Sequence, residues 1–222
     1  MFGALLILLP SIRGIPLRAA GALLMLSLFL PPVSQLDDLE TRLDFLDVGQ
    51  GLAVLLSRPE YLLVYDTGPG NGQLGEAARN MVEGTIRPMI ESTGRSPDMV
   101  ITSHADLDHA GGLAKLRVIY PDAQYLANLP GNRDGIDACV SPSRWATDQL
   151  SFEVLHPTTG LPYLGNDSSC VVSVKGLGMN LLLSGDISHT VERRLVSNRL
   201  SRHTFLSVPH HGSATSSSEV FI

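Results

Sequence analysis

Short apolar runs separated by Gly, Pro and charged residues recur along the chain from residue 41 onward, a pattern typical of β-strands. The runs predict strands at residues 41–48, 52–57, 61–65, 99–102, 117–120, 152–155, 170–175, 179–184 and 204–208. The first three are joined by short turns and therefore predict a meander within one sheet. Helical spacing predicts helices at residues 76–93, 110–116 and 188–200. Two sheets flanked by helices follow from this order of elements.

The segment 128–148 interrupts the pattern, because it is rich in Gly, Pro, Asp and Arg. Such a composition is typical of an irregular surface loop, and loops of this kind often carry functional residues. We therefore expect an irregular loop there, at the border of a site.

The first 35 residues have a different character from the rest. Residues 2–30 are almost all apolar, broken by Arg13 and Arg18 and by two prolines, whereas the chain after Gln35 is acidic on balance. The run 19–30 would span about 18 Å as a helix, which is short of the roughly 30 Å core of a bilayer. A signal peptide is disfavoured, because the first residues carry no positive charge and no small-residue cleavage site follows. We divide the chain into a hydrophobic membrane segment, 1–35, and a second domain, 36–222.

Composition limits the function classes. At 222 residues and 44% hydrophobic, the chain is long enough for one domain with a substantial core. Its net charge of −6 argues against a broadly basic surface for nucleic acid, so any contact with DNA would be local. Cys139 and Cys170 are far apart and lack zinc-knuckle spacing, and we favour two free buried thiols over a disulfide.

Residues 104–109, with the sequence HADLDH, place four potential metal ligands within six residues, just after an apolar run. Two imidazoles and two carboxylates this close together are costly to bury unpaired, whereas one or two divalent cations satisfy them. Asp186 follows another predicted strand, and the pair His210 and His211 follows the last one. The sequence therefore predicts a metal site.

The order of these motifs resembles a known family. The chain carries DVGQG from Asp47, DTG from Asp66, the motif 104–109, SGD ending at Asp186 and HHGS ending at Ser213. Over about residues 40–218 this set resembles the metallo-β-lactamase fold and, more narrowly, the C-terminal domain of the ComEC/Rec2 family of DNA-uptake channel proteins. The resemblance implies an α/β fold, an αββα sandwich that is truncated at the C-terminus. It also implies that the chain is a fragment and that its apolar start is a remnant of channel helices.

The resemblance further implies two divalent metal ions. Their ligands would be His104, Asp106, Asp108, His109, Asp186 and one of His210 and His211. The first pair would hold one ion, the second pair the other, and Asp186 would bridge both. We assign His211 to the metal site and His210, with Asp108, to catalysis, although the roles of His210 and His211 are interchangeable at this point.

Asp106 stands where many members of the fold have a histidine. A carboxylate oxygen is a harder ligand than an imidazole nitrogen, and this favours Mn²⁺ while allowing Zn²⁺.

A further group is expected to support the ligands or the substrate: Asp47, Asp66, Asn166, Asp167, Ser168 and Ser213. Asp66 is the favoured hydrogen-bond partner of a ligand. Asp167 has two alternative roles, one as a metal ligand and one as a turn cap or phosphate contact.

Together these features predict a metal-dependent hydrolase of the DNA-uptake machinery, a phosphodiesterase or nuclease acting on incoming DNA. The alternatives are a hydrolase of small esters with the same fold and a non-catalytic scaffold of the channel. The expected partners are DNA, the membrane and the rest of the channel. Arg13 and Arg18 favour an inner-membrane location with the domain on the outer, periplasmic face.

Overall fold

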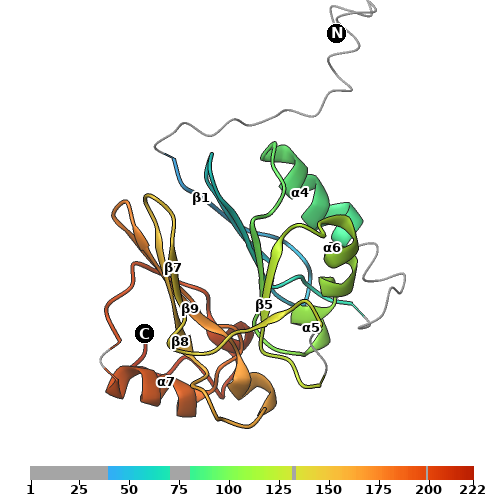
Figure 1. The fold of residues 1–222 in the computed structure, drawn as a ribbon. Helices are drawn as coiled ribbons and strands as arrows, with labels where there is room; N and C mark the ends of the chain where they lie inside the picture. Colours follow the sequence, from blue (N-terminus) through green and yellow to red (C-terminus); the bar gives the residue numbers. More distant parts are fainter. Residues whose placement is uncertain (1–39, 71–80, 132–133, 199) are drawn as a thin grey trace, which may run out of the picture. The chain divides into compact units, whose positions relative to one another are not determined.

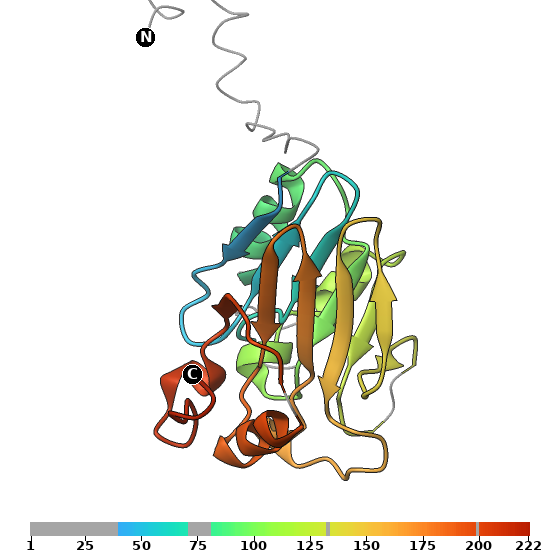
Figure 2. The same cartoon turned by 90° about the vertical axis from the view of Figure 1, so that its left-hand side faces the viewer.

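The structure is a computed structural model that describes residues 40–70, 81–131, 134–198 and 200–222. Two β-sheets face each other and helices cover their outer faces, which confirms the expected mixed α/β sandwich (Figures 1 and 2). The hydrophobic segment 1–35 and the first part of the helix expected at 76–93 lie outside the described residues. Within the described residues, no helix is both long enough and apolar enough to cross a bilayer.

The first sheet has six strands and begins with the expected meander. Its strands, in spatial and sequence order, are β1 (Arg42–Phe45), β2 (Val54–Ser57), β3 (Leu62–Tyr65), β4 (Met99–Thr102), β5 (Gln124–Ala127) and β6 (Asp137–Ala138). The first three strands pair antiparallel, and β3 to β6 pair in parallel. β2, β3 and β4 are buried along their whole length, as expected for strands covered on both faces.

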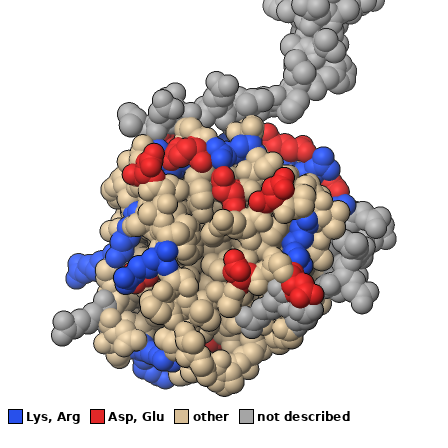
Figure 3. Space-filling view, in the orientation of Figure 1, with Lys and Arg blue, Asp and Glu red and all other residues tan. Residues whose placement is uncertain are grey.

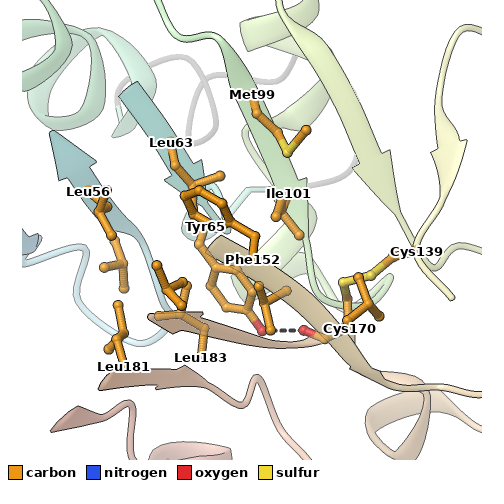
Figure 4. Close-up of a cluster of buried hydrophobic side chains, with 14 of the residues drawn as sticks. Leu56, Leu63, Tyr65, Met99, Ile101, Cys139, Phe152, Cys170, Leu181 and Leu183 are labelled. Atoms are coloured by element: carbon orange, nitrogen blue, oxygen red, sulfur yellow. Dashed lines mark hydrogen bonds between the residues drawn. A yellow bond between two sulfur atoms is a disulfide. The ribbon is translucent and has the colours of Figure 1, made fainter. Parts of the chain in front are cut away.

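The second sheet has five strands. They lie in the order β11 (Phe205–Leu206), β10 (Met179–Leu183), β9 (Val171–Gly176), β8 (Ser151–His156) and β7 (Arg144–Ala146). β10 and β11 are parallel, and the remaining pairs are antiparallel. Alternating burial along β8 directs Phe152 and Val154 into the space between the sheets, where they pack with residues of the first sheet (Figure 4).

Helices cover the outer faces. A π-helical turn at Val82–Ile86 continues into α4 (Arg87–Ser92), and α6 (Leu113–Ile119) packs beside it over the first sheet. The second sheet is covered by α7 (His189–Ser197), which begins at Ser188 with a hydrogen bond from Thr190 N to the serine hydroxyl.

Two predicted elements are wrong. The strand expected at 117–120 is the end of α6, and the strand that follows is β5, a few residues later. Leu113 and Leu116 are buried three residues apart, as on one face of a helix, and so short an apolar run does not distinguish helix from strand. The loop expected at 128–148 contains two short strands, β6 and β7.

The prediction of two free thiols is also wrong, because Cys139 and Cys170 form a disulfide (Figure 4). Their Cα atoms are 5.8 Å apart, a distance that sequence separation alone could not reveal. Cys139 follows β6 of the first sheet and Cys170 precedes β9 of the second, so the bond joins the two sheets covalently. Closing a loop of 31 residues stabilises the fold by about 3–4 kcal/mol in the chain-entropy model.

Candidate metal centre

The candidate ligands all follow strand ends. The chain leaves the buried strand β4 at Ser103 and enters a loop that ends at α5 (Leu107–Ala110). β10 delivers Asp186, and β11 is followed by a turn at Pro209–Gly212. The first group belongs to one sheet and the second to the other, so the site forms where the two sheets meet. Loops held by buried strands give ligands rigid supports.

Four side chains converge at this place. One ligand atom each of Asp108, His109, Asp186 and His211 lies within 4.8 Å of the others. His109 Nε2 is 3.1 Å from Asp186 Oδ1 and 3.2 Å from His211 Nε2. His211 Nε2 is 3.5 Å from both Asp108 Oδ2 and Asp186 Oδ2. Metal–ligand bonds of about 2.0–2.2 Å give tetrahedral edges of about 3.3–3.6 Å. These donor distances are close to such edges, and the pair His109 Nε2 and Asp108 Oδ2 is wider at 3.9 Å, so the four side chains could hold one divalent ion.

His104 and Asp106 lie beside this cluster. The ring centroids of His104 and His109 are 4.4 Å apart, and His104 Nε2 is 3.7 Å from Asp106 Oδ2. His104 Nε2 is buried and has no hydrogen-bond partner among the described residues. A buried polar atom without a partner is costly, and a cation held between His104 and Asp106 would satisfy it. The pair therefore fits a second ion next to the four-residue cluster.

The charges of the cluster shift the pKa values of its members. Burial alone would lower the pKa of His109, but the carboxylates of Asp66 and Asp186 outweigh it and raise that pKa to about 10. Burial lowers the pKa of His104, and the neighbouring His109 adds to this effect. Burial opposes ionisation of Asp186, yet the surrounding imidazoles outweigh it and lower its pKa. In the absence of metal, the raised pKa favours the protonated form of His109 at neutral pH, and a cation would compete with the Nε2 proton.

Asp66 lies beneath the ligands at the end of β3 and is fully buried. Its Oδ2 is 2.7 Å from His109 Nδ1, and its Oδ1 accepts a 2.6 Å hydrogen bond from Ser103 N. The first contact orients the His109 ring so that Nε2 faces the cluster. Asp66 has a φ of +60°, a left-handed conformation that is uncommon outside glycine and typical of strained functional positions.

The structure separates the two adjacent histidines. His210 and His211 have φ angles of +49° and +52°, and a non-glycine residue in this region costs about 1–2 kcal/mol. His211 reaches the cluster, whereas His210 Nε2 is 3.2 Å from Asn166 Nδ2 and its Nδ1 is 3.3 Å from Thr215 Oγ1. This geometry favours His211 as the ligand and leaves His210 beside it.

The remaining predicted residues have partners elsewhere. Asp167 accepts hydrogen bonds from Ser188 N (2.9 Å) and Ser188 Oγ (3.0 Å) at the start of α7, so its position matches the turn-cap alternative. Ser168 is buried, and its carbonyl accepts a bond from Asn128 Nδ2. Asp47 is exposed and accepts a hydrogen bond from Gly49 N, and Ser213 Oγ lies 3.2 Å from Thr215 Oγ1.

Three residues at the site were not predicted. Ser103 and Ser169 are fully buried, with their hydroxyl groups 2.9 and 3.4 Å from His104 Nδ1. Tyr163 accepts a 2.9 Å hydrogen bond from Ala105 N within the ligand loop. Ser103 could have been found from its place directly before the ligand motif. Tyr163 gives no such signal, because 58 residues separate it from its partner.

Gly51 allows close contact between the β1–β2 connection and the candidate ligand loop. A Cβ atom at Gly51 would lie 2.3 Å from the carbonyl oxygen of Asp108, and its φ of +140° is strained for other residues. The next residue, Leu52, donates a 3.2 Å hydrogen bond to the same oxygen. The glycine therefore lets the β1–β2 connection pack directly against the backbone of a candidate ligand.

The raised pKa of His109 predicts how stability depends on pH in chelator-treated protein. Protonated His109 stabilises the fold fully below its unfolded pKa of about 6.5, and this contribution is lost as the pH rises through about 10. We expect the free energy of unfolding in urea to fall by at most about 5 kcal/mol over this range. H109Q should flatten the profile, whereas H156Q should keep the slope, because burial lowers the pKa of His156. A wild-type profile without a decline would contradict the assignment.

The match to known proteins agrees with this geometry. Residues 46–222 match the model of the metallo-beta-lactamase superfamily. The chain is 36% identical over 181 residues to the uncharacterized protein YcaI of Escherichia coli, covering 81% of this chain and 23% of that one. It is 30% identical to recombination protein 2 of Haemophilus influenzae, covering 93% and 26%. It is 34% identical to competence protein ComA of Neisseria gonorrhoeae, covering 99% and 30%.

The chain thus spans less than a third of the length of the curated relatives it matches. The resemblance to the ComEC/Rec2 competence proteins that the motifs indicated is confirmed by these relatives. Because the family model covers most of the chain, and the four-layered fold and the ligand cluster agree with it, the chain belongs to the metallo-β-lactamase superfamily.

Proposed function

We propose that the chain is a metal-dependent phosphodiesterase domain that cleaves DNA during its uptake through a membrane channel. The observation that carries the proposal is the convergence of Asp108, His109, Asp186 and His211 from two sheets. Two relatives named for competence and recombination support DNA and the rest of a channel as partners.

Each site residue has a role in this proposal. His104 and Asp106 would hold one divalent ion, Asp108, His109 and His211 would hold the other, and Asp186 is proposed as a ligand shared by the two sites. Bound divalent ions supply Lewis acidity toward a phosphate oxygen and lower the pKa of water. The Asp108 carboxylate, whose side chain is 30% exposed, orients the attacking water and accepts the proton that the water loses as its oxygen bonds to phosphorus. His210, next to the cluster and in contact with Asn166, donates a proton to the leaving oxygen.

Contact with DNA is local in this proposal. Figure 3 shows Lys and Arg in small separate groups among Asp and Glu on one face of the molecule. This face therefore offers no continuous basic band, and with a net charge of −6 on the chain we propose that a phosphodiester is held mainly at the metal centre. Asn166 and Ser213, beside His210, are the residues proposed to contact the substrate.

Attachment to the inner membrane through residues 1–35, with the domain on the outer face, completes the proposal. Arg13 and Arg18 support this orientation, since positive residues in short loops tend to stay in the cytoplasm. The disulfide between Cys139 and Cys170 supports it independently, because disulfides persist in oxidising compartments.

Activity is tested with D108N and D186N, which remove a charge but keep the shape of the side chain. We expect either variant to lower kcat/KM for single-stranded DNA and for a nitrophenyl phosphodiester at least about 100-fold, with loss of bound metal. Wild-type protein should hold two ions per chain by mass spectrometry. The matched control is D167N, which alters an aspartate that accepts hydrogen bonds from Ser188 at the start of α7 and should keep both metal and activity.

The outcomes separate the alternatives. Fewer than one ion per folded chain would contradict the proposal. Faster turnover of a lactone or thioester than of the phosphodiester would indicate a small-ester hydrolase. Bound metal without turnover of any substrate would indicate a scaffold.

Manganese is proposed as the preferred ion, because Asp106 makes one of the two sites harder. Titration of stripped protein with each metal should give higher phosphodiesterase turnover with Mn²⁺ than with Zn²⁺. D106H should shift the preference toward zinc. Zinc as the clearly better activator of wild-type protein would contradict the prediction.

The location is tested by the redox state of the two cysteines. Intact cells are quenched with acid, which stops thiol–disulfide exchange, and free thiols are then labelled with a maleimide reagent. Since Cys139 and Cys170 are the two cysteines of the chain, the wild-type protein should be labelled only after treatment with a thiol reductant. C139S should be labelled at Cys170 without reduction. Wild-type labelling at both positions before reduction, or a reporter fusion after Gln35 that is active only as a cytoplasmic enzyme, would overturn the placement.

A further inference from the structure

The hydroxyl group of Ser103 lies between a buried carboxylate and a candidate ligand. Ser103 Oγ is 2.9 Å from Asp66 Oδ2 and 2.9 Å from His104 Nδ1. All three residues are fully buried. A hydroxyl has one proton to donate, so it can donate to one of these neighbours and must accept from the other.

The surroundings of Asp66 decide where that proton goes. Asp66 Oδ1 faces the backbone N–H of Ser103 at 2.6 Å, and Oδ2 faces His109 Nδ1 at 2.7 Å. An ionised carboxylate accepts hydrogen bonds and donates none. The Ser103 hydroxyl therefore donates to Asp66 Oδ2, which leaves its lone pairs for His104.

The hydroxyl of Ser169, which precedes a strand of the second sheet, is also a hydrogen-bond acceptor toward His104 Nδ1. Ser169 Oγ donates to the carbonyl oxygen of Asn166 at 2.7 Å and accepts from Asp186 N at 3.0 Å. It lies 3.4 Å from His104 Nδ1 and can offer that atom a lone pair but not a proton. Both hydroxyls near His104 Nδ1 are thus acceptors, and Nδ1 must be the donor.

Close packing keeps the two serines in these positions. Gly185 has a φ of +55°, and a Cβ atom there would lie 2.8 Å from Ser103 Cβ and 2.8 Å from Ser169 Oγ. A larger residue would push the serines away from the His104 ring. The glycine that precedes Asp186 is therefore part of the same arrangement.

We infer that Ser103 is a positioning residue. Its hydroxyl donates a hydrogen bond to Asp66 and accepts one from His104 Nδ1, and this holds His104 in the tautomer with the proton on Nδ1 and the lone pair on Nε2. His104 Nε2 is a buried atom without a hydrogen-bond partner among the described residues, and it lies 3.7 Å from Asp106 Oδ2. A histidine binds a metal through its unprotonated nitrogen. Asp66 thereby orients two candidate ligands: it contacts His109 Nδ1 directly and acts on His104 through the Ser103 hydroxyl. The role in metal binding rests on the proposed function, whereas the tautomer does not.

The tautomer is read directly from long-range ¹H–¹⁵N correlation spectra of the full chain, labelled with ¹⁵N-histidine and kept metal-free at mildly alkaline pH. H104Q assigns the His104 signals by their loss. We expect wild-type His104 to be protonated on Nδ1 and bare on Nε2. S103A should raise the fraction protonated on Nε2, and S103T, which restores the hydroxyl, should return the wild-type pattern.

The matched control is S57A. Ser57 is also fully buried on a strand, and its hydroxyl has no partner among the described residues, so its removal should leave the His104 signals unchanged. Wild-type His104 protonated on Nε2, or S103A with an unchanged tautomer, would overturn the inference. Dispersed amide signals in each variant show that it is folded.

Metal affinity gives a second readout that does not depend on turnover. S103A should bind Mn²⁺ and Zn²⁺ about 10- to 100-fold more weakly, with S103T within a few-fold of wild type. Equal affinities in S103A and wild type would overturn the role in metal binding. Absence of phosphodiesterase activity in a protein with the expected tautomer and metal affinity would refute the proposed function alone.

Discussion

The buried carboxylate of Asp66 orders the polar groups beneath the candidate ligands. A fully buried charge is costly unless hydrogen bonds and opposite charges surround it, and Asp66 meets this requirement with the Ser103 backbone, the Ser103 hydroxyl and His109. These contacts can form only if the ends of β3 and β4 lie side by side, which the parallel pairing of the two strands ensures. The pairing of β3 with β4 therefore also fixes the orientation of His104 and His109.

The donor distances depend equally on how the two sheets are held together, because each sheet supplies part of the site. Tyr65, the residue before Asp66, donates a 2.7 Å hydrogen bond to the carbonyl of Cys170, and Cys170 N donates to the carbonyl of Ser103 (Figure 4). The disulfide adds a covalent link at the same residue. At the other end, the buried Arg58 reaches across to Gln149 Oε1 at 2.8 Å. The candidate ligand cluster lies beside the first set of links, because Ser103 and Cys170 directly adjoin its residues.

Much of the fold could be predicted from the sequence, because most strands have apolar runs that end at turns or polar motifs. The candidate ligand loop could be proposed for the same reason, since its potential donors are adjacent in sequence. Other features depend on contacts between distant residues and could not be predicted. Asp167 and Asp186 are both candidate site aspartates in the sequence, and only the packing of α7 shows that Asp167 accepts a hydrogen bond from Ser188 N. Likewise, only the side-chain contacts distinguish the two histidines, since His211 contacts His109 whereas His210 contacts Asn166 and Thr215.

The charge of the site explains why cations suit it better than protons. Asp66, Asp106, Asp108 and Asp186 bring four carboxylates to one place, and their partners within the described residues include histidines, serines and backbone N–H groups. A proton on His109 offsets one of these charges. Two divalent cations carry four positive charges and would balance all four carboxylates while the imidazoles stay neutral. A phosphodiester would then approach a site whose negative charge is neutralised. The same ions that would bind the buried ligand atoms would therefore also reduce the repulsion of an anionic substrate by a chain whose net charge is −6.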